Sequence, residues 1–142
     1  MTGVCMRIMA IDYGQKRVGI AMSDSLGVIS QPLLTLGVKS QRELIKRLKF
    51  IIEENDVRLV LVGNPLSHSG NSTRISERIH RFVKALRKSI VVEVKLWDER
   101  FTSKYALQIL KEKGIKQKGK IDQIAASLML EEYLKSRSEC SV

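Results

Sequence analysis

The sequence has little cysteine and no long apolar run. Its two cysteines, Cys5 and Cys140, lie one near each end of the 142 residues. Two distant cysteines form neither a disulfide framework nor the paired spacing of a zinc site, so we expect a reduced, cytoplasmic protein. The apolar runs are far shorter than the roughly 20 residues that a membrane-spanning helix needs. Because the first residues also lack the pattern of a signal peptide, we expect neither secretion nor membrane association.

Acidic residues are outnumbered by basic ones. There are 25 Lys and Arg against 15 Asp and Glu, which gives a formal net charge of +10 at pH 7. Such a surplus favours an acidic partner, and nucleic acid and anionic membrane are the usual candidates. A protein that is simply basic would show the same excess, so charge alone leaves both interpretations open. The length predicts one domain, 1–142, that can fold without a metal or a disulfide.

Hydrophobic periodicity predicts five strands. The first is apolar on both faces, as in a central strand, and is followed by a tight turn in which Gly14 is free to adopt a positive φ. The third contains Pro32, which indicates an edge position. The predicted strands are residues 6–12, 17–23, 28–36, 59–62 and 90–96.

Helical spacing of apolar residues predicts four helices. The first follows Ser40, an N-cap candidate with Glu43 as its capping-box partner. Its apolar residues span 44–52; those of the second span 75–86, and the third and fourth helices cover about 102–113 and 121–135. The element order is therefore βββαβαβαα. Hairpins make the first three strands antiparallel, and the later strands, each reached through a helix, run parallel to the first. The fold class is α/β with a mixed sheet.

Polar residues collect where three parallel strands end. The carboxyl ends of the first, fourth and fifth strands should share one rim of the sheet, the usual place for ligands in open α/β folds. The residues at these ends are Asp12, Gly63, Asn64, Pro65, Asp98 and Glu99.

Asp122 adds a further acid. It lies on the otherwise apolar face of the last helix, where burial of a lone carboxylate is costly unless a cation offsets it. Two or three carboxylates together with substrate phosphates are the usual way to hold Mg²⁺, and such ions can drive phosphodiester cleavage. Taken singly, Asp12 can be a turn residue, Asp122 a helix cap and Glu99 a surface residue. Their convergence on one rim favours function.

Basic residues flank this rim. Residues 111–120 hold five lysines and end two positions before Asp122, so they can grip a phosphate backbone or form an ordinary solvated loop. The cations that we expect to contact nucleic acid are Lys16, Arg17, Arg100, Lys116, Lys118 and Lys120. Trp97 precedes the acids of the fifth strand and is more typical of core packing than of base stacking.

Four motifs, in order, resemble those of the YqgF (RuvX) family, also called pre-16S rRNA nucleases. They are DYGQKRVG (12–19), GNPL (63–66) with Gly70 downstream, DERFT (98–102) and KIDQIAA (120–126). The resemblance covers nearly the whole chain. It departs from the family at Asn64, where the family more often has an apolar residue, and Gly14 and Thr102 are among the positions expected to shape the site.

The resemblance implies a ribonuclease-H-like three-layer fold with helices on both faces of the sheet, related to the Holliday-junction resolvase RuvC. Matching positions carry over Asp12, Glu99 and Asp122 as the catalytic acids. The implied activity is Mg²⁺- or Mn²⁺-dependent cleavage at the 5′ end of the small-subunit ribosomal RNA precursor, by a monomer or a homodimer. The motif does not decide between Asp98 and Glu99 as the metal ligand, and we choose Glu99.

Three other functions fit parts of the pattern. A resolvase would cut four-way DNA junctions and would need a two-fold dimer to nick two symmetric strands. A non-catalytic RNA-binding module would keep the fold and the charge, although the presence of all three acids argues against it. An ATP-binding domain of the actin type has a similar first hairpin, but it clasps its nucleotide between two domains.

Overall fold

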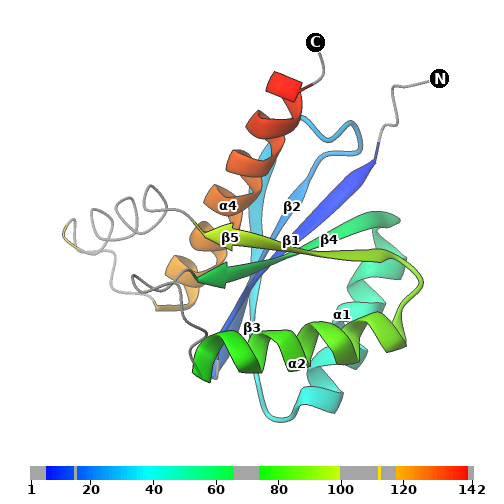
Figure 1. The fold of residues 1–142 in the computed structure, drawn as a ribbon, viewed down its shortest axis with the longest axis vertical. Helices are drawn as coiled ribbons and strands as arrows, with labels where there is room; N and C mark the ends of the chain where they lie inside the picture. Colours follow the sequence, from blue (N-terminus) through cyan, green and yellow to red (C-terminus); the bar gives the residue numbers. More distant parts are fainter. Residues whose placement is uncertain (1–5, 15, 66–73, 100–111, 113–117, 141–142) are drawn as a thin grey trace.

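Five strands form a mixed sheet in the computed structural model, which describes residues 6–14, 16–65, 74–99, 112 and 118–140. Their spatial order is β3-β2-β1-β4-β5 (Figure 1). β1 pairs antiparallel with β2, and β2 with β3, whereas β1 and β4, and β4 and β5, are parallel. The strands are β1 Arg7–Tyr13, β2 Arg17–Ser23, β3 Ser30–Gly37, β4 Val57–Pro65 and β5 Glu93–Glu99. The predicted mixed sheet is confirmed.

Helices cover both faces of this sheet. α1 (Gln41–Glu54) and α2 (Arg74–Ser89) lie on one face and α4 (Lys118–Cys140) on the other (Figure 1). Because successive strand residues point to opposite faces, β1 contributes side chains to the hydrophobic core on each face of the sheet. Met9 and Ile11 pack with α1 and α2, whereas Ile8 and Ala10 pack with α4. The predicted third helix, 102–113, lies outside the described residues.

The predicted start of α1 is confirmed. The Ser40 hydroxyl accepts a hydrogen bond of 3.1 Å from the Glu43 backbone N–H, which satisfies one of the donors that a helix leaves without an intrahelical partner. The apolar stripe of the helix is buried at Leu44, Ile45, Leu48 and Ile52. α1 therefore packs as its sequence pattern indicates.

The edge position of β3 is confirmed as well. Pro32 lies in this outer strand near a register shift in the β2–β3 pairing, and the Ser30 hydroxyl donates to the Ser127 carbonyl oxygen at 2.7 Å, which fastens the strand to α4. The expectation for Gly14 needs correction, since the residues with positive φ in the described chain are Gly27 and Asp56. Gly14 is required for a different reason, because a β-carbon there would come within 2.5 Å of the Arg17 carbonyl oxygen.

Several element boundaries differ from the sequence prediction. β3 starts at Ser30 rather than at residue 28, and β4 extends beyond 59–62 at both ends, so Gly63, Asn64 and Pro65 lie within it. β5 starts at Glu93 rather than at residue 90, because the Ile90 N–H still donates to Leu86 at the end of α2. The strand then continues to Glu99, so Asp98 and Glu99 lie within it and not after it. α4 is longer than 121–135 at both ends, so Lys118 and Lys120 belong to its first turn instead of a loop. In the described part of the chain, no helix combines the length and hydropathy of a membrane span.

Candidate active site

Asp12 lies near the end of β1 on the side of the sheet that α4 covers. Ile8 and Ala10, four and two positions before it along the same side of the strand, belong to the core beneath α4. The partner of Asp12 across the β1–β2 pair is Gly19. Residues opposite each other in antiparallel strands share a face and lie about 5 Å apart. The space above Gly19 is therefore the space beside the Asp12 carboxylate.

Asp122 fills that space. A β-carbon placed on Gly19 would overlap the backbone carbonyl group of Asp122, so the absence of a side chain is what lets α4 come down onto the sheet. Asp122 is the fifth residue of α4, and the helix has no acidic residue in its first turn. Helix capping therefore does not explain this residue. The structure brings Asp12 and Asp122 to one face, at the rim where the sequence predicts them, although they are 110 positions apart in the sequence.

Arg17 connects the start of β2 to this acid. Its Nε donates to Oδ2 of Asp122 at 2.8 Å, and the side chains are 40% and 24% exposed, respectively. Arg17 lies two residues before Gly19 and so shares its side of the strand. The sequence predicts a cation for the nucleic-acid backbone at this position. In the structure, that cation also holds one of the two acids.

Asp98 lies on the opposite face. Leu96 and Val94 alternate with Trp97, and both pack on the side of α1 and α2, so Asp98 shares their side. There the Asn64 amide donates to Oδ1 of Asp98 at 3.3 Å, and the Ser76 hydroxyl of α2 donates to the Asn64 carbonyl oxygen at 3.2 Å. Asn64, the departure from the family pattern, thus links β4, β5 and α2. Asp98 therefore contacts Asn64 on one face of the sheet, whereas Asp12 lies on the other.

Glu99 occupies the last position of β5, with its Cα paired to Pro65. Its side chain lies outside the described residues. Two positions earlier, Trp97 packs edge-on against Tyr133 of α4, with ring centroids 5.2 Å apart. This contact confirms Trp97 as a packing residue and shows that its position on β5 faces α4.

The expected cations are distributed unevenly. Lys16 and Lys120 are exposed, and Lys118 opens α4. Cations at a helix N-terminus oppose the helix dipole, so the lysines at positions 118 and 120 destabilise the start of α4. Residues that break a local rule in this way are often retained for function. Arg100, Thr102 and Lys116 lie outside the described residues.

The donor atoms at this site suit a hard divalent cation. Within the described residues, no three His, Cys, Asp or Glu side chains come together as a ligand group. Asp12 and Asp122 lie on the same face of the sheet, on either side of Gly19, and carboxylate oxygens are the donors that Mg²⁺ and Mn²⁺ take in proteins. Mg²⁺ is commonly held by one or two carboxylates, with substrate phosphates completing its shell. The chemistry of the pair thus fits the metal that the sequence predicts.

Comparison with known proteins assigns the family. The sequence model of RuvX, described as Holliday junction resolvase, matches residues 6–136. The chain belongs to the RuvX family. A relative from Koribacter versatilis is 40% identical over 92% of this chain and 88% of its own length, and one from Thermoanaerobacter pseudethanolicus is 38% identical over 93% and 98%. Both carry the name "Putative pre-16S rRNA nuclease".

Solved structures agree with this RuvX fold. Thermus thermophilus RuvC in complex with a Holliday junction substrate superposes with a TM-score of 0.60 at 15% identity, covering 94% of this chain and 96% of that one. The Fowlpox virus resolvase bound to Holliday junction DNA gives 0.53 at 13% identity, covering 93% and 99%. At such identities the likeness concerns the fold alone, which is that of the ribonuclease-H-like resolvases.

Proposed function

We propose that this RuvX chain is a divalent-metal-dependent nuclease that hydrolyses phosphodiester bonds, with Asp12, Glu99 and Asp122 as its catalytic acids. The observation that supports the proposal is the contact of the Asp122 backbone with Gly19, the residue paired with Asp12, which puts both acids on the face that α4 covers. Strand alternation supports position 99, two residues after Trp97, as the third member, since Asp98 contacts Asn64 on the opposite face.

These acids would hold Mg²⁺ or Mn²⁺, which when bound supplies Lewis acidity to the phosphodiester and lowers the pKa of the attacking water. Arg17 orients Asp122 through the Nε contact. A guanidinium carries five N–H donors, of which this contact uses one, so Arg17 can bind a substrate phosphate at the same time. Lys16, Lys118 and Lys120, together with Arg100 and Lys116, supply further charge for the backbone.

The substrate that we propose is the 5′ region of the ribosomal RNA precursor, in a cytoplasmic protein. Support comes from the relatives, which share 36–40% identity with this chain and are named for that activity. A second candidate is a four-way DNA junction, because the family is described as a resolvase and RuvC in complex with such a junction shares the fold. Cleavage of such a junction would require two copies of the chain, since two symmetric strands must be nicked.

One experiment separates these functions. Labelled ribosomal RNA precursor and a four-way DNA junction are incubated side by side with wild type and Asp12→Asn, in Mn²⁺ and in chelator. We expect metal-dependent cutting of the RNA that the variant loses while it keeps its fold and its RNA binding. Symmetric cutting of the junction alone would establish a resolvase. Tight binding without cutting of either substrate would show a non-catalytic binding module.

A further inference from the structure

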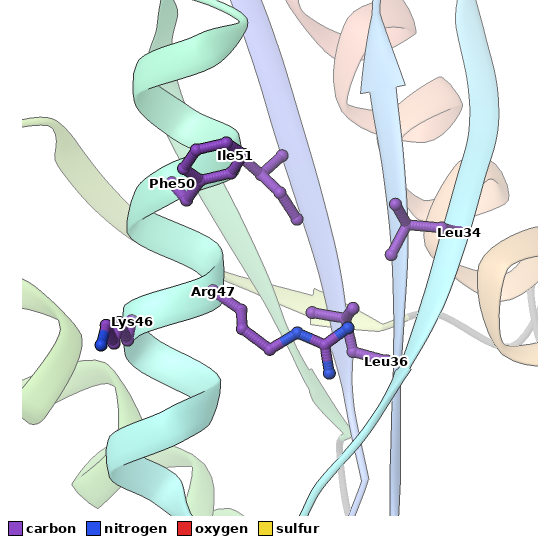
Figure 2. A pocket seen from close by; sticks show the side chains of 6 residues that line it. All are labelled: Leu34, Leu36, Lys46, Arg47, Phe50 and Ile51. Atoms are coloured by element: carbon purple, nitrogen blue, oxygen red, sulfur yellow. The ribbon is translucent and has the colours of Figure 1, made fainter.

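A groove lies between β3 and α1, on the face of the sheet opposite α4. It encloses about 430 Å³ and is lined by Leu34, Leu36, Lys46, Arg47, Phe50 and Ile51. Leu34 and Leu36 of β3 face the helix, and Arg47 extends from the helix toward Leu36 (Figure 2). The groove thus has an apolar floor. Its lining, all of it within the described chain, contains two cations and no acid.

Phe50 is unusual in this setting. The buried stripe of α1 is made by other residues, and Phe50 is 64% exposed. Such a ring contributes little to the core, yet it lies within three or four residues of Lys46 and Arg47 along the helix, the spacing at which helical side chains are neighbours. An exposed aromatic ring beside cations is the arrangement on which proteins stack unpaired bases while they neutralise the flanking phosphates.

The groove and the acids lie on opposite faces of the sheet, near the same point of its β3 edge. Thr35 of β3 pairs with Gly19, and Gly19 pairs with Asp12, so the three form one row across the strands. Two strand spacings separate Thr35 from Asp12, roughly 10 Å. Leu34 and Leu36, the neighbours of Thr35, line the groove. A single strand that passes around the β3 edge can therefore reach both places.

A second copy of the chain is a poorer occupant. A two-fold contact would bring the same patch of both copies together, and here each copy of the patch carries two cations, Lys46 and Arg47, and no acid to pair with those of the other copy. Pro32 and the register shift beside it also protect the β3 edge from pairing with another strand.

We propose that this groove binds an unpaired nucleotide of the substrate, with its base on Phe50 and its phosphates at Arg47 and Lys46. The proposal rests on the nuclease function proposed above, because it takes nucleic acid as the partner. It adds a binding site on the opposite side of the sheet from the acids. Since Phe50 is exposed, its replacement should leave the fold intact, which thermal melting checks.

Binding of a fluorescent oligouridine to the non-cleaving Asp12→Asn protein, followed by anisotropy, tests the proposal. In this background we expect Phe50→Leu to weaken binding about five- to tenfold, the low end of the loss of one base stack, and Phe50→Trp to preserve it. Arg47→Gln should lower the slope of log affinity against log salt by about 0.7, the loss of one phosphate contact on a single strand. Arg81→Gln, an exposed arginine on α2, is the matched control and should bind normally.

Several results would overturn the proposal. Phe50→Leu and Arg47→Gln could bind like their background, or Phe50→Trp could lose as much affinity as Phe50→Leu. Sedimentation could show that Phe50→Leu separates a dimer, which would make the groove a contact between copies. Oligoglutamate could displace the oligouridine as well as unlabelled RNA does, which would indicate an acidic peptide. Because no cleavage is measured, a failure of the nuclease activity would not be confused with a failure of this site.

Discussion

Single side chains decide how the acids of this site are held. Asp122 is a partly buried carboxylate paired with Arg17, whose Nε lies 2.8 Å from its Oδ2. Both groups are too exposed for the pair to contribute much to folding, and exposed ion pairs are worth about 0–1 kcal/mol. The contact therefore matters more for the charge at the site than for stability.

Arg17→Gln should separate these two effects. Removal of a cation beside Asp122 reduces the repulsion of a bound metal ion, so we expect tighter Mn²⁺ binding in calorimetric titration of the protein alone. Cleavage should nevertheless slow, because the substrate phosphate loses a partner. Asp122→Asn is the control that should weaken Mn²⁺ binding. Weaker Mn²⁺ binding in Arg17→Gln would mean that Arg17 serves only to position the acid.

Asp24 gives the turn between β2 and β3 a pH dependence. Its carboxylate accepts hydrogen bonds from the Ile29 and Val28 backbone N–H groups at 3.0 and 2.7 Å, and these lower the pKa of Asp24 below its ordinary value of 3.8. A lowered folded-state pKa means that the stabilisation is present above the ordinary value and is lost as pH falls through the folded-state value.

We therefore expect Asp24→Ala to lower the urea midpoint of unfolding at pH 7. The difference from wild type should shrink as the pH falls below 3.8 and disappear below the lowered folded-state pKa, where the carboxyl group is protonated in the folded protein too. Urea unfolding followed by circular dichroism at the two pH values measures it. A difference that grows under acid would contradict the assignment.

At the scale of elements, the approach of α4 to β2 builds the site. Gly19 meets the backbone of Asp122 and Gln123, which cannot move aside as a flexible side chain would. Gly19→Ala should therefore destabilise the fold by about 1–3 kcal/mol, as overpacking does, and should impair cleavage by shifting Asp122. Gly37→Ala is the matched control, because a β-carbon added at Gly37 would meet nothing within 4 Å. Equal unfolding free energies for the two variants would show that α4 is not seated as described.

The pattern of the sequence predicts those elements whose own residues define them. The strand directions, the Ser40 cap, the edge position of Pro32 and the apolar face of α4 follow from local periodicity and turn chemistry, and the structure confirms them. Asp12 and Asp122 were singled out by the same patterns, and their catalytic role stays a prediction. The predicted start of β5 at residue 90 was wrong, because the Ile90 N–H still donates to Leu86 of α2. The apolar run from residue 90 does not reveal that hydrogen bond.

The individual side-chain contacts between distant residues could not be predicted in this way. The Arg17–Asp122 pair joins residues 105 positions apart, and the Asn64–Asp98–Ser76 network depends on the register of β4 and β5. Gly19 was within the first motif, and its place opposite Asp12 in the hairpin was the signal that it contacts the site. Phe50 was also visible as an aromatic residue outside the apolar stripe of α1.

For the whole molecule, the net charge of +10 is expected to govern association with nucleic acid. Replacing Lys116, Lys118 and Lys120 with Ala should weaken RNA binding and flatten its salt dependence, by about 0.7 in slope for each lost phosphate contact on a single strand. Removal of cations from the first turn of α4 should leave stability unchanged or slightly raised. The same change at Arg81, Lys84 and Lys88 of α2 is the charge-matched control. An equal loss of slope in both triple variants would indicate nonspecific attraction.

The most direct test of the account compares the acids within one cleavage assay. Initial rates on the ribosomal RNA precursor in Mn²⁺ are measured for Asp12→Asn, Glu99→Gln, Asp122→Asn and Asp98→Asn, with melting curves to verify folding. We expect the first three to fall to the rate of wild type in chelator, and Asp98→Asn to retain metal-dependent cleavage because its side chain lies on the opposite face of the sheet. Loss of cleavage in folded Asp98→Asn, with activity retained in Glu99→Gln, would contradict the account.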